Sequence, residues 1–291
     1  MNEINHELGI IALESCRELG QQVNKIIQQK RNTEESFLIP TNEIRFSNGE
    51  GKVKLPETVR GKDIYILCDV GNYSCTYKMF GFTNHKGPDE HFQDIKRTVS
   101  AIRGKAARIT VIMPLLYQSR QHRRKGRESL DCALALQELE RLGVDVGLFY
   151  KRRDHSTVVN GKNPIVDHEY MGREVEGKDV LIVDDMIASG ESVLDIALEL
   201  KKRNAKNVYV ATTFAFFTEG LEKFNKYYSD GIISKVYSTN LTYISPELRE
   251  TKWFNAVDMS EFLSRVINRL NYGKSIAKYM DATRIIRSLL K

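Results

Sequence analysis

The order of apolar and polar residues along the chain predicts alternating strands and helices. Residues 7–30 carry apolar side chains at helical spacing and predict an amphipathic helix. Residues 36–55 alternate around Asn48 and Gly49, a pair that favours a tight turn between two strands. From residue 60 onward, short apolar runs alternate with helical patterns, which predicts an α/β fold.

A duplicated segment indicates two related halves. Gly-Lys-Asp, a short apolar run and a final Asp occur at residues 60–69 and again at 176–185. A helical pattern and a second apolar run follow both copies, at 91–106 and 108–116 in the first and at 192–205 and 207–217 in the second. Such β-α-β units predict parallel sheets that are covered by helices on both faces.

Further elements follow from caps and periodicity. Residues 129–143 predict a helix that Ser129 caps and Gly143 ends. Residues 144–154 predict a strand that finishes in a basic cluster. Two more helical patterns lie around residues 259–270 and 275–291.

Composition and charge narrow the function classes. The 291 residues suffice for one large domain or two ordinary ones, and 41% hydrophobic with 28% charged residues is typical of a soluble globular protein. Lys and Arg exceed Asp and Glu by 44 to 38, a net charge of +6. That excess suits an anionic ligand, either nucleic acid or a phosphorylated metabolite, but a solvated basic surface explains the charge alone equally well.

Cysteine usage and the N-terminus favour a cytoplasmic protein. Cys16, Cys68, Cys75 and Cys132 form no Cys-x-x-Cys pair, and we expect reduced, mostly buried thiols. The N-terminus has no basic region followed by an apolar core, so no signal peptide is evident. No apolar run approaches the roughly 20 residues that a membrane span needs.

The strongest chemical signal is "VLIVDDMIASGES", residues 180–192. Residues 180–183 predict a strand, and ligands of open parallel sheets bind at the carboxyl ends of the strands. The backbone amides of residues 188–192, with two serine hydroxyls, form a suitable phosphate cradle before a helix. Asp184 and Asp185 would face sugar hydroxyls, directly or through a magnesium ion. The alternative is ordinary capping of a helix by Asp and Ser.

Residues 180–192 resemble the phosphoribosyl-pyrophosphate loop that type I phosphoribosyltransferases share with ribose-phosphate pyrophosphokinases. Upstream, residues 46–63 (FSNGEGKVKLPETVRGKD), 120–124 (RQHRR) and 150–154 (YKRRD) resemble the pyrophosphokinases. The resemblance covers residues 36–270. It implies two related, type I phosphoribosyltransferase-like parallel-sheet domains: residues 1–145 with ATP-contacting motifs, and a shortened domain, 146–291, with the phosphoribosyl-binding turn.

The resemblance also implies a reaction and its residues. A diphosphoryl group of ATP moves to ribose 5-phosphate, with Mg²⁺ as cofactor, giving phosphoribosyl pyrophosphate and AMP. Lys151 and Arg153 match the catalytic basic pair, whose cations suit charged phosphate oxygens. The residues that match ribose 5-phosphate contacts are Asp184, Asp185, Ala188, Ser189, Gly190, Glu191 and Ser192. The family usually has an acidic residue and a glycine where Ala188 and Glu191 stand, and we expect the Glu191 side chain to turn away from the phosphate.

ATP contacts follow from the same resemblance. Arg120 and Gln121 match an ATP-contacting pair, although His122 stands where an acidic residue is usual. Phe46, Asn48 and Glu50 match a hairpin that reads the adenine of ATP held mainly by a neighbouring subunit, with Phe46 stacking on the base. The resemblance therefore implies a homo-oligomer with small-molecule ligands. Nucleic acid is disfavoured because the basic residues cluster at the motifs and no aromatic stacking platform is evident.

One family segment is missing from the sequence. After residue 145 the family continues with a strand that carries magnesium-binding Asp and His residues, then further helices and strands, whereas this chain runs directly into residues 146–154. The metal ligands are therefore unknown. We expect the sheet of the second half to have an exposed edge or an altered strand order, and the activity to be reduced or lost. Two alternatives stay open: a non-catalytic regulatory homologue that binds phosphoribosyl compounds and associates with complete subunits, and a phosphoribosyltransferase.

Overall fold

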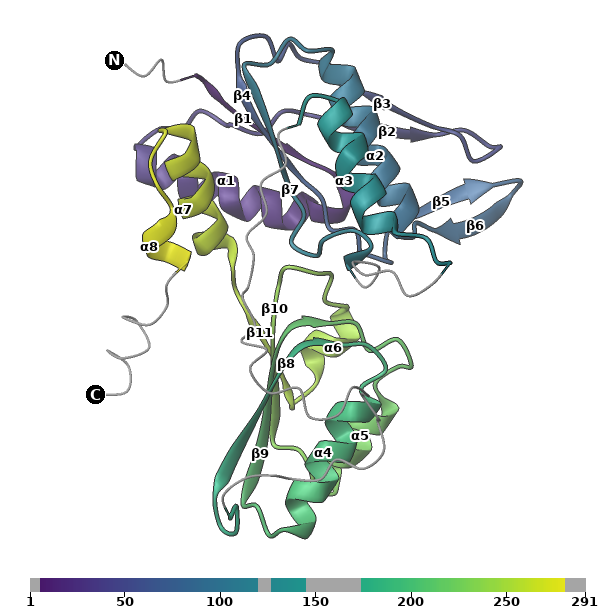
Figure 1. Cartoon of the computed structure of the whole chain (residues 1–291), viewed down its shortest axis with the longest axis vertical. Helices are drawn as coiled ribbons and strands as arrows, with labels where there is room; N and C mark the ends of the chain where they lie inside the picture. Colours follow the sequence, from purple (N-terminus) through teal and green to yellow (C-terminus); the bar gives the residue numbers. More distant parts are fainter. Residues whose placement is uncertain (1–5, 120–126, 145–173, 281–291) are drawn as a thin grey trace. The chain divides into compact units, whose positions relative to one another are not determined.

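The computed structural model describes residues 6–119, 127–144 and 174–280 (Figure 1). These residues form two compact units. Unit 1 contains the described residues up to 144 together with 240–243 and 258–280, and unit 2 contains 174–239 and 244–257. The two units thus separate near the predicted boundary at residue 145, but two later segments of the chain belong to unit 1.

Unit 1 is built on a three-stranded parallel sheet in the order β1-β4-β7. Its register aligns Leu8 with Asp63 and Asp63 with Arg108. The strands are β1 (Leu8–Ala12), β4 (Asp63–Leu67) and β7 (Arg108–Ile112).

Helices cover both faces of this sheet, as predicted. One face packs against α1 (Arg17–Arg31) and α7 (Ser260–Asn271), and the other packs against α2 (Pro88–Ile102) and α3 (Asp131–Arg141). Successive β4 residues alternate between the faces: Tyr65 joins the α1 and α7 core, whereas Ile66 joins the α2 and α3 core.

The prediction of one helix over residues 7–30 is wrong in its first third. Leu8–Ala12 form strand β1, Glu14–Cys16 form a short 3-10 helix, and α1 begins only at Arg17. Strand β1 is apolar at successive positions because the sheet is covered on both faces, and periodicity does not separate such a strand from a buried helix. Gly9 also marks close packing, since a Cβ there would lie 2.6 Å from the side chains of Ile39 and Ile64.

Two antiparallel hairpins extend from the same side of unit 1 (Figure 1). The predicted hairpin pairs β2 (Asn42–Arg45) with β3 (Gly51–Lys54) and confirms the turn at Asn48 and Gly49. The other, β5 (Thr76–Met79) with β6 (Phe82–His85), lies between β4 and α2 and was not predicted. The Phe80 amide donates to the Ser47 carbonyl at 2.8 Å, so the tips of the hairpins are bonded to each other.

Unit 2 contains a four-stranded parallel sheet in the order β11-β10-β9-β8. Helices α4 (Glu191–Lys202), α5 (Glu222–Ser229) and α6 (Pro246–Glu250) pack with the buried side chains of Val208, Val210 and Val236. The strands are β8 (Asp179–Ile187), β9 (Asn207–Ala215), β10 (Lys235–Thr239) and β11 (Phe254–Val257).

Among the described residues, no helix covers the opposite face of the unit 2 sheet. On edge strand β8, Leu181 and Val183 are 57% and 75% exposed, and Tyr237 on β10 is also exposed. Within the described residues β8 pairs with β9 alone, which agrees with the expectation of an exposed edge. The expectation of helices on both faces is wrong for unit 2 within the described residues, since α4, α5 and α6 all contribute to the same core.

The duplication is visible in individual hydrogen bonds. The Gly61 amide donates to the Lys105 carbonyl and the Gly177 amide to the Asn204 carbonyl, each at 2.9 Å. Both glycines have positive φ, 72° and 67°, a conformation that other residues rarely adopt. Each glycine precedes the first residue of its strand by two positions, so both halves enter their sheets through the same turn.

The other predicted elements are partly described. Helix α3 ends at Arg141 before Gly143, but Ser129 does not cap it; its hydroxyl donates to the Asp131 carboxylate instead. Helix α7 confirms the pattern at 259–270, and only α8 (Ala277–Met280) is described within 275–291. The strand predicted at 144–154 lies almost wholly outside the described residues. None of the described helices has the length and apolar character that crossing a bilayer requires.

Candidate functional site

The acidic pair of the second half lies on β8 itself. The strand was predicted to end at Val183, but it remains paired with β9 as far as Ile187, so Asp184 and Asp185 are strand residues. Both carboxylates are exposed, and the Asp185 amide donates to Asp184 Oδ1 at 2.8 Å. The turn between strand and helix is therefore shorter than expected and consists of residues 188–190.

The segment that follows β9 holds this turn through two backbone hydrogen bonds. The Phe216 amide donates to the Ile187 carbonyl at 2.8 Å, and the Thr218 amide donates to the Ala188 carbonyl at 3.0 Å. Gly190 has φ of 92°, and a Cβ there would lie 2.4 Å from the Phe224 ring. Only glycine fits this position, for both conformational and steric reasons.

The turn offers donors to an anion. In the described part of the chain, the amides of Ala188, Ser189 and Gly190 have no hydrogen-bond acceptor. Helix α4 begins directly afterwards at Glu191, and no side chain caps its N-terminus. Free amides and the positive end of a helix dipole together favour a bound phosphate or carboxylate.

Glu191 is the residue of this segment whose charge opposes an anion. Its side chain lies 3.4 Å from Lys223 Nζ on α5, and both side chains are exposed. The partner offsets the charge of Glu191, and Lys223 also pairs with Glu219. Ser192 is exposed on the first turn of the helix.

The predicted ATP-contacting residues Phe46, Asn48 and Glu50 lie on one tight turn. The Phe46 amide donates to the Glu50 carbonyl at 2.8 Å, and the Asn48 side-chain amide donates to the Glu50 carboxylate at 3.1 Å. Phe46 is 49% exposed. The turn thus presents an aromatic ring beside an amide and a carboxylate, a set that can stack on a base and bond its edge.

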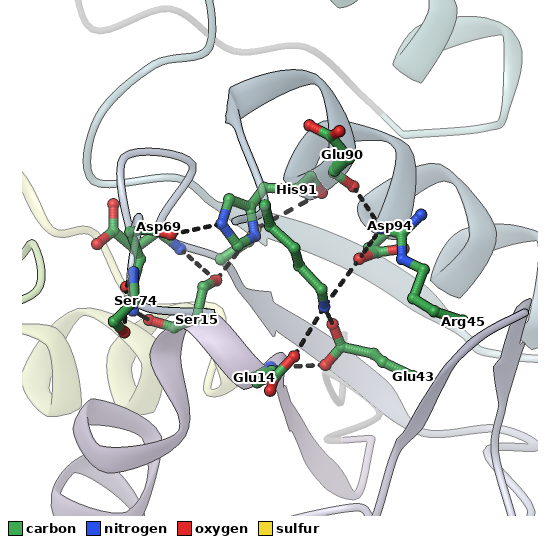
Figure 2. Close-up of polar contacts among 12 residues, drawn as sticks. Glu14, Ser15, Glu43, Arg45, Asp69, Ser74, Glu90, His91 and Asp94 are labelled. Atoms are coloured by element: carbon green, nitrogen blue, oxygen red, sulfur yellow. Dashed lines mark hydrogen bonds and ion pairs between the residues drawn. The ribbon is translucent and has the colours of Figure 1, made fainter. Parts of the chain in front are cut away.

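A buried ion network ties this hairpin to α2, and sequence reasoning missed it. Lys86 is 3% exposed, and its Nζ lies 2.8 Å from Glu14, 3.1 Å from Glu43 and 3.3 Å from Asp94. Figure 2 shows these three carboxylates around one ammonium group, with Arg45 also reaching Asp94. Because Glu43 and Arg45 belong to β2, the network fixes this strand of the hairpin.

Burial and pairing oppose each other in this network. Burial disfavours the Lys86 cation, but Glu43, Glu14 and Asp94 outweigh it and hold the Lys86 pKa above its ordinary value. Burial raises the pKa of Glu43, although Lys86 partly offsets that effect. No sequence signal separates these charges from surface charges, because they come together from β2, the 3-10 helix after β1, the residue after β6 and α2 only after folding.

Asp69 is the counterpart of Asp185 in the first half, yet its surroundings differ completely. It is 2% exposed, and its carboxylate accepts from the Gly71 amide at 2.8 Å, the Thr242 hydroxyl at 3.0 Å and the Tyr243 amide at 3.1 Å. Burial raises the pKa of Asp69 to about 6. Figure 2 places it near Ser15 and His91. The Asp69 carboxylate of the first half therefore forms its hydrogen bonds with other residues of the same chain.

The remaining predicted site residues lie outside the described residues. They are the catalytic pair, Lys151 and Arg153, and the ATP pair, Arg120 and Gln121. Within the described ranges, no group of three or more His, Cys, Asp or Glu side chains is arranged to hold a metal ion. The two predicted sites that are described, residues 184–192 and 46–50, belong to different units.

Two family models match adjoining parts of the chain. The N-terminal domain of ribose phosphate pyrophosphokinase matches residues 8–143, and the phosphoribosyl transferase domain matches residues 132–244.

Curated relatives named ribose-phosphate pyrophosphokinase match different lengths of this chain. A ribose-phosphate pyrophosphokinase from Vibrio cholerae is 31% identical over 46% of this chain, which spans only 40% of that protein. One from Pasteurella multocida is 24% identical over 80% of this chain and 88% of the relative. One from Mycoplasmopsis pulmonis is 21% identical over 94% and 95%. Both halves of the chain therefore align with this enzyme.

The alignment with one of these relatives includes positions that this chain does not fill. The Pasteurella multocida alignment has 295 positions and includes 80% of this 291-residue chain, or about 233 residues, so about 60 positions have no residue of this chain. The crystal structure of phosphoribosylpyrophosphate synthetase from Mycobacterium smegmatis superposes with a TM-score of 0.69 at 18% identity, covering 92% of this chain and 99% of that one. At that identity the likeness concerns the fold.

Proposed function

Because this chain belongs to the ribose-phosphate pyrophosphokinase family, we propose that it transfers the diphosphoryl group of ATP to ribose 5-phosphate. The anomeric hydroxyl oxygen forms a bond to the β-phosphorus of ATP. The bond between that phosphorus and the oxygen bridging to the α-phosphate breaks, and AMP leaves. The products are phosphoribosyl pyrophosphate and AMP, and the hydroxyl proton is released.

The observation that carries the proposal is the turn after β8. Three amides without an acceptor in the described chain and an uncapped helix N-terminus follow two exposed carboxylates. The 5-phosphate suits residues 188–192, where backbone amides do the binding. Asp184 and Asp185 then bond the ribose hydroxyls, which need acceptors.

The triphosphate requires cations and a base-reading surface. We assign Lys151 and Arg153 to the transferred phosphoryl oxygens, where catalysis of this reaction depends on positioning and neutralised charge. Arg120 and Gln121 complete the ATP contacts. Phe46 stacks on adenine while Asn48 and Glu50 exchange their mutual hydrogen bond for bonds to the base edge. In this assignment, residues up to 145 hold ATP and residues 184–192 hold the sugar phosphate. Lys151 and Arg153 contact the phosphoryl group that is transferred between them.

The residues present suit a magnesium ion that takes only a few protein ligands. Mg²⁺ commonly takes one or two protein carboxylates and fills its remaining positions with phosphates and water. The adjacent, exposed Asp184 and Asp185 supply such a pair, whereas the described residues hold no larger ligand group. When bound, the ion supplies charge neutralisation to the phosphate oxygens, and the two aspartates orient the sugar.

The missing segment favours a second candidate function. The sequence lacks the family's metal-binding Asp and His, and β8 is an exposed edge with apolar side chains. A regulatory homologue that binds phosphoribosyl compounds and associates with complete subunits accounts for both features. A phosphoribosyltransferase is disfavoured because it has no use for the hairpin at residues 46–50. In either surviving case we expect an oligomeric, cytoplasmic protein.

Calorimetric titration separates the two functions. The enzyme binds ATP and ribose 5-phosphate in the presence of magnesium, whereas the regulatory homologue binds ribose 5-phosphate alone. Lys151→Ala should abolish turnover and leave ribose 5-phosphate affinity within about twofold, because its cation serves the transition state. Gln137→Ala, on exposed helix surface, is the control and should change neither. A parallel loss of sugar phosphate binding in Lys151→Ala would contradict the catalytic assignment.

A further inference from the structure

The second hairpin lies against the turn that we assign to the base of ATP. The Phe80 amide donates to the carbonyl of Ser47, which stands between Phe46 and Asn48. A Cβ on Gly49 would lie 2.7 Å from Met79 Sδ, so the tips are packed as well as bonded. The turn at Phe80 and Gly81 is therefore part of the surroundings of residues 46–50.

Phe80 has a conformation and an exposure that folding does not explain. Its φ is 50°, in the left-handed region, and Gly81 follows at 85°. Two-residue hairpin turns with two positive φ values strongly prefer Asn-Gly, since an aromatic residue is strained there. The side chain is 74% exposed, so burial does not repay the strain. A strained residue whose side chain stays exposed does not serve the core. This points to a role of the Phe80 ring in contacting another molecule.

The chemistry around Phe80 fits a nucleobase. Phe82, two residues later, is 75% exposed, and Phe46 is also exposed. Each hairpin therefore has an exposed aromatic residue at or next to its turn. Lys52, which pairs with Ile44 in the β2–β3 ladder, adds an exposed cation to the same hairpin. Aromatic faces with cations nearby are the combination that binds bases joined to phosphates.

We propose that the Phe80 ring is a second aromatic contact for the base of ATP, and that the β5–β6 hairpin exists to carry it to the turn at 46–50. The inference rests on the proposed function and extends its ATP site. It makes Phe80 a determinant of nucleotide affinity, in addition to Phe46, Asn48 and Glu50.

The substitution Phe80→Asn removes the aromatic ring while keeping the hairpin, so it tests the ring alone. Asn-Gly is the preferred pair for this turn, so the variant should keep the hairpin and the amide bond to Ser47 and melt at the same or a higher temperature. We expect ATP to bind roughly 5- to 100-fold more weakly, which corresponds to the loss of one base–aromatic contact. Ribose 5-phosphate affinity should stay within twofold. Phe80→Tyr, which keeps a ring, should restore ATP binding.

Controls separate this inference from its alternatives. Leu134→Gln removes a 54% exposed apolar side chain from α3 and should leave both affinities unchanged. Unchanged ATP affinity in Phe80→Asn overturns the proposal. So does a loss that occurs only together with a smaller assembly in sedimentation, because the ring would then join copies of the chain. Wild-type protein that binds no ATP overturns the proposed function, and with it this inference, and is distinct from either result.

Discussion

At the scale of single residues, Asp69 and Asp185 show how one motif serves two purposes. Both end the same Gly-Lys-Asp segment of the duplication. Asp185 is exposed on β8, whereas Asp69 is buried and accepts three hydrogen bonds from its own chain. Thr242 and Tyr243, which supply two of these bonds, come from the later half of the sequence. The first half has thus lost the exposure that a ligand-binding acid needs.

Asp69 predicts a specific pH dependence of stability. Its pKa is about 6 in the folded protein and near 3.9 when unfolded, so between these values the folded state holds more protons. The contribution of Asp69 to the free energy of unfolding should therefore fall as the pH rises from about 4 to about 6 and stay constant above. Urea unfolding from pH 4 to 7 should show this decline in wild type relative to Asp69→Asn. Parallel pH profiles would contradict the raised pKa.

Substitution of Asp185 should weaken ligand binding and leave the stability of the fold nearly unchanged. Because its carboxylate is exposed, Asp185→Asn should change the melting temperature little while weakening ribose 5-phosphate by about 10-fold, through the loss of a charge-assisted acceptor. Asp195→Asn removes the same charge from the exposed surface of α4 and should leave the affinity unchanged. Tighter binding in Asp185→Asn would mean that the carboxylate merely repels the phosphate.

At the scale of elements, the turn before α4 depends on Gly190. Gly190→Ala should lower the free energy of unfolding by about 2–4 kcal/mol, because a Cβ meets the Phe224 ring and φ is positive. Gly177→Ala is a matched control with a positive φ but no atom within 4 Å, and should cost about 1–2 kcal/mol. Denaturant unfolding compares the two. Equal losses would show that Phe224 does not press on this turn.

The network around Lys86 predicts a large effect from one cation. Lys86→Met leaves Glu14, Glu43 and Asp94 without their shared ammonium group, and should cost about 3–5 kcal/mol of unfolding free energy. Lys96→Met breaks the exposed pair with Glu138 and should cost less than about 1 kcal/mol. Hydrogen exchange at residues 42–54 should quicken in the first variant alone. Similar stability of the two variants would refute the structural role of Lys86.

Sequence patterns predicted the elements whose signals are local. The hairpin at Asn48 and Gly49 has its own turn chemistry, and the duplicated Gly-Lys-Asp segments mark equivalent turns before β4 and β8. Strand β1 was mistaken for helix because its burial on both faces removes alternation. Hairpin β5–β6 was missed because Phe-Gly is an uncommon pair for its turn.

The candidate site was predictable to a similar extent. Residues 184–192 were selected as a candidate site because a strand, an acidic pair and small residues adjoin in sequence. The length of β8 was underestimated, since pairing with β9 as far as Ile187 is a tertiary property. The ion network of Lys86 and the burial of Asp69 depend on segments far apart in sequence, so neither has a local pattern.

At the scale of the whole molecule, the two units have diverged from a common plan. Unit 1 keeps helices on both faces of its sheet, whereas the sheet of unit 2 is open on one face in the described residues. The alignment with the Pasteurella multocida enzyme leaves about 60 positions without a residue of this chain. The exposed Leu181 and Val183 lie on the open face of the unit 2 sheet.

The open face bears on the choice between enzyme and regulatory homologue. A large exposed apolar surface is more usual at an interface than on a free surface. In the regulatory alternative, we expect a complete homologue to cover this face and to supply metal ligands of its own. The hairpin at 46–50 and the basic residues of the ATP motifs are expected in an enzyme and have no role in a pure sugar phosphate sensor.

The formation of AMP from ATP, measured with and without ribose 5-phosphate in the presence of magnesium, tests the proposed function. We expect AMP only when the sugar phosphate is added, in equal amount to phosphoribosyl pyrophosphate, and none from Lys151→Ala. AMP that appears equally in both reactions, or in neither, would contradict the proposed function.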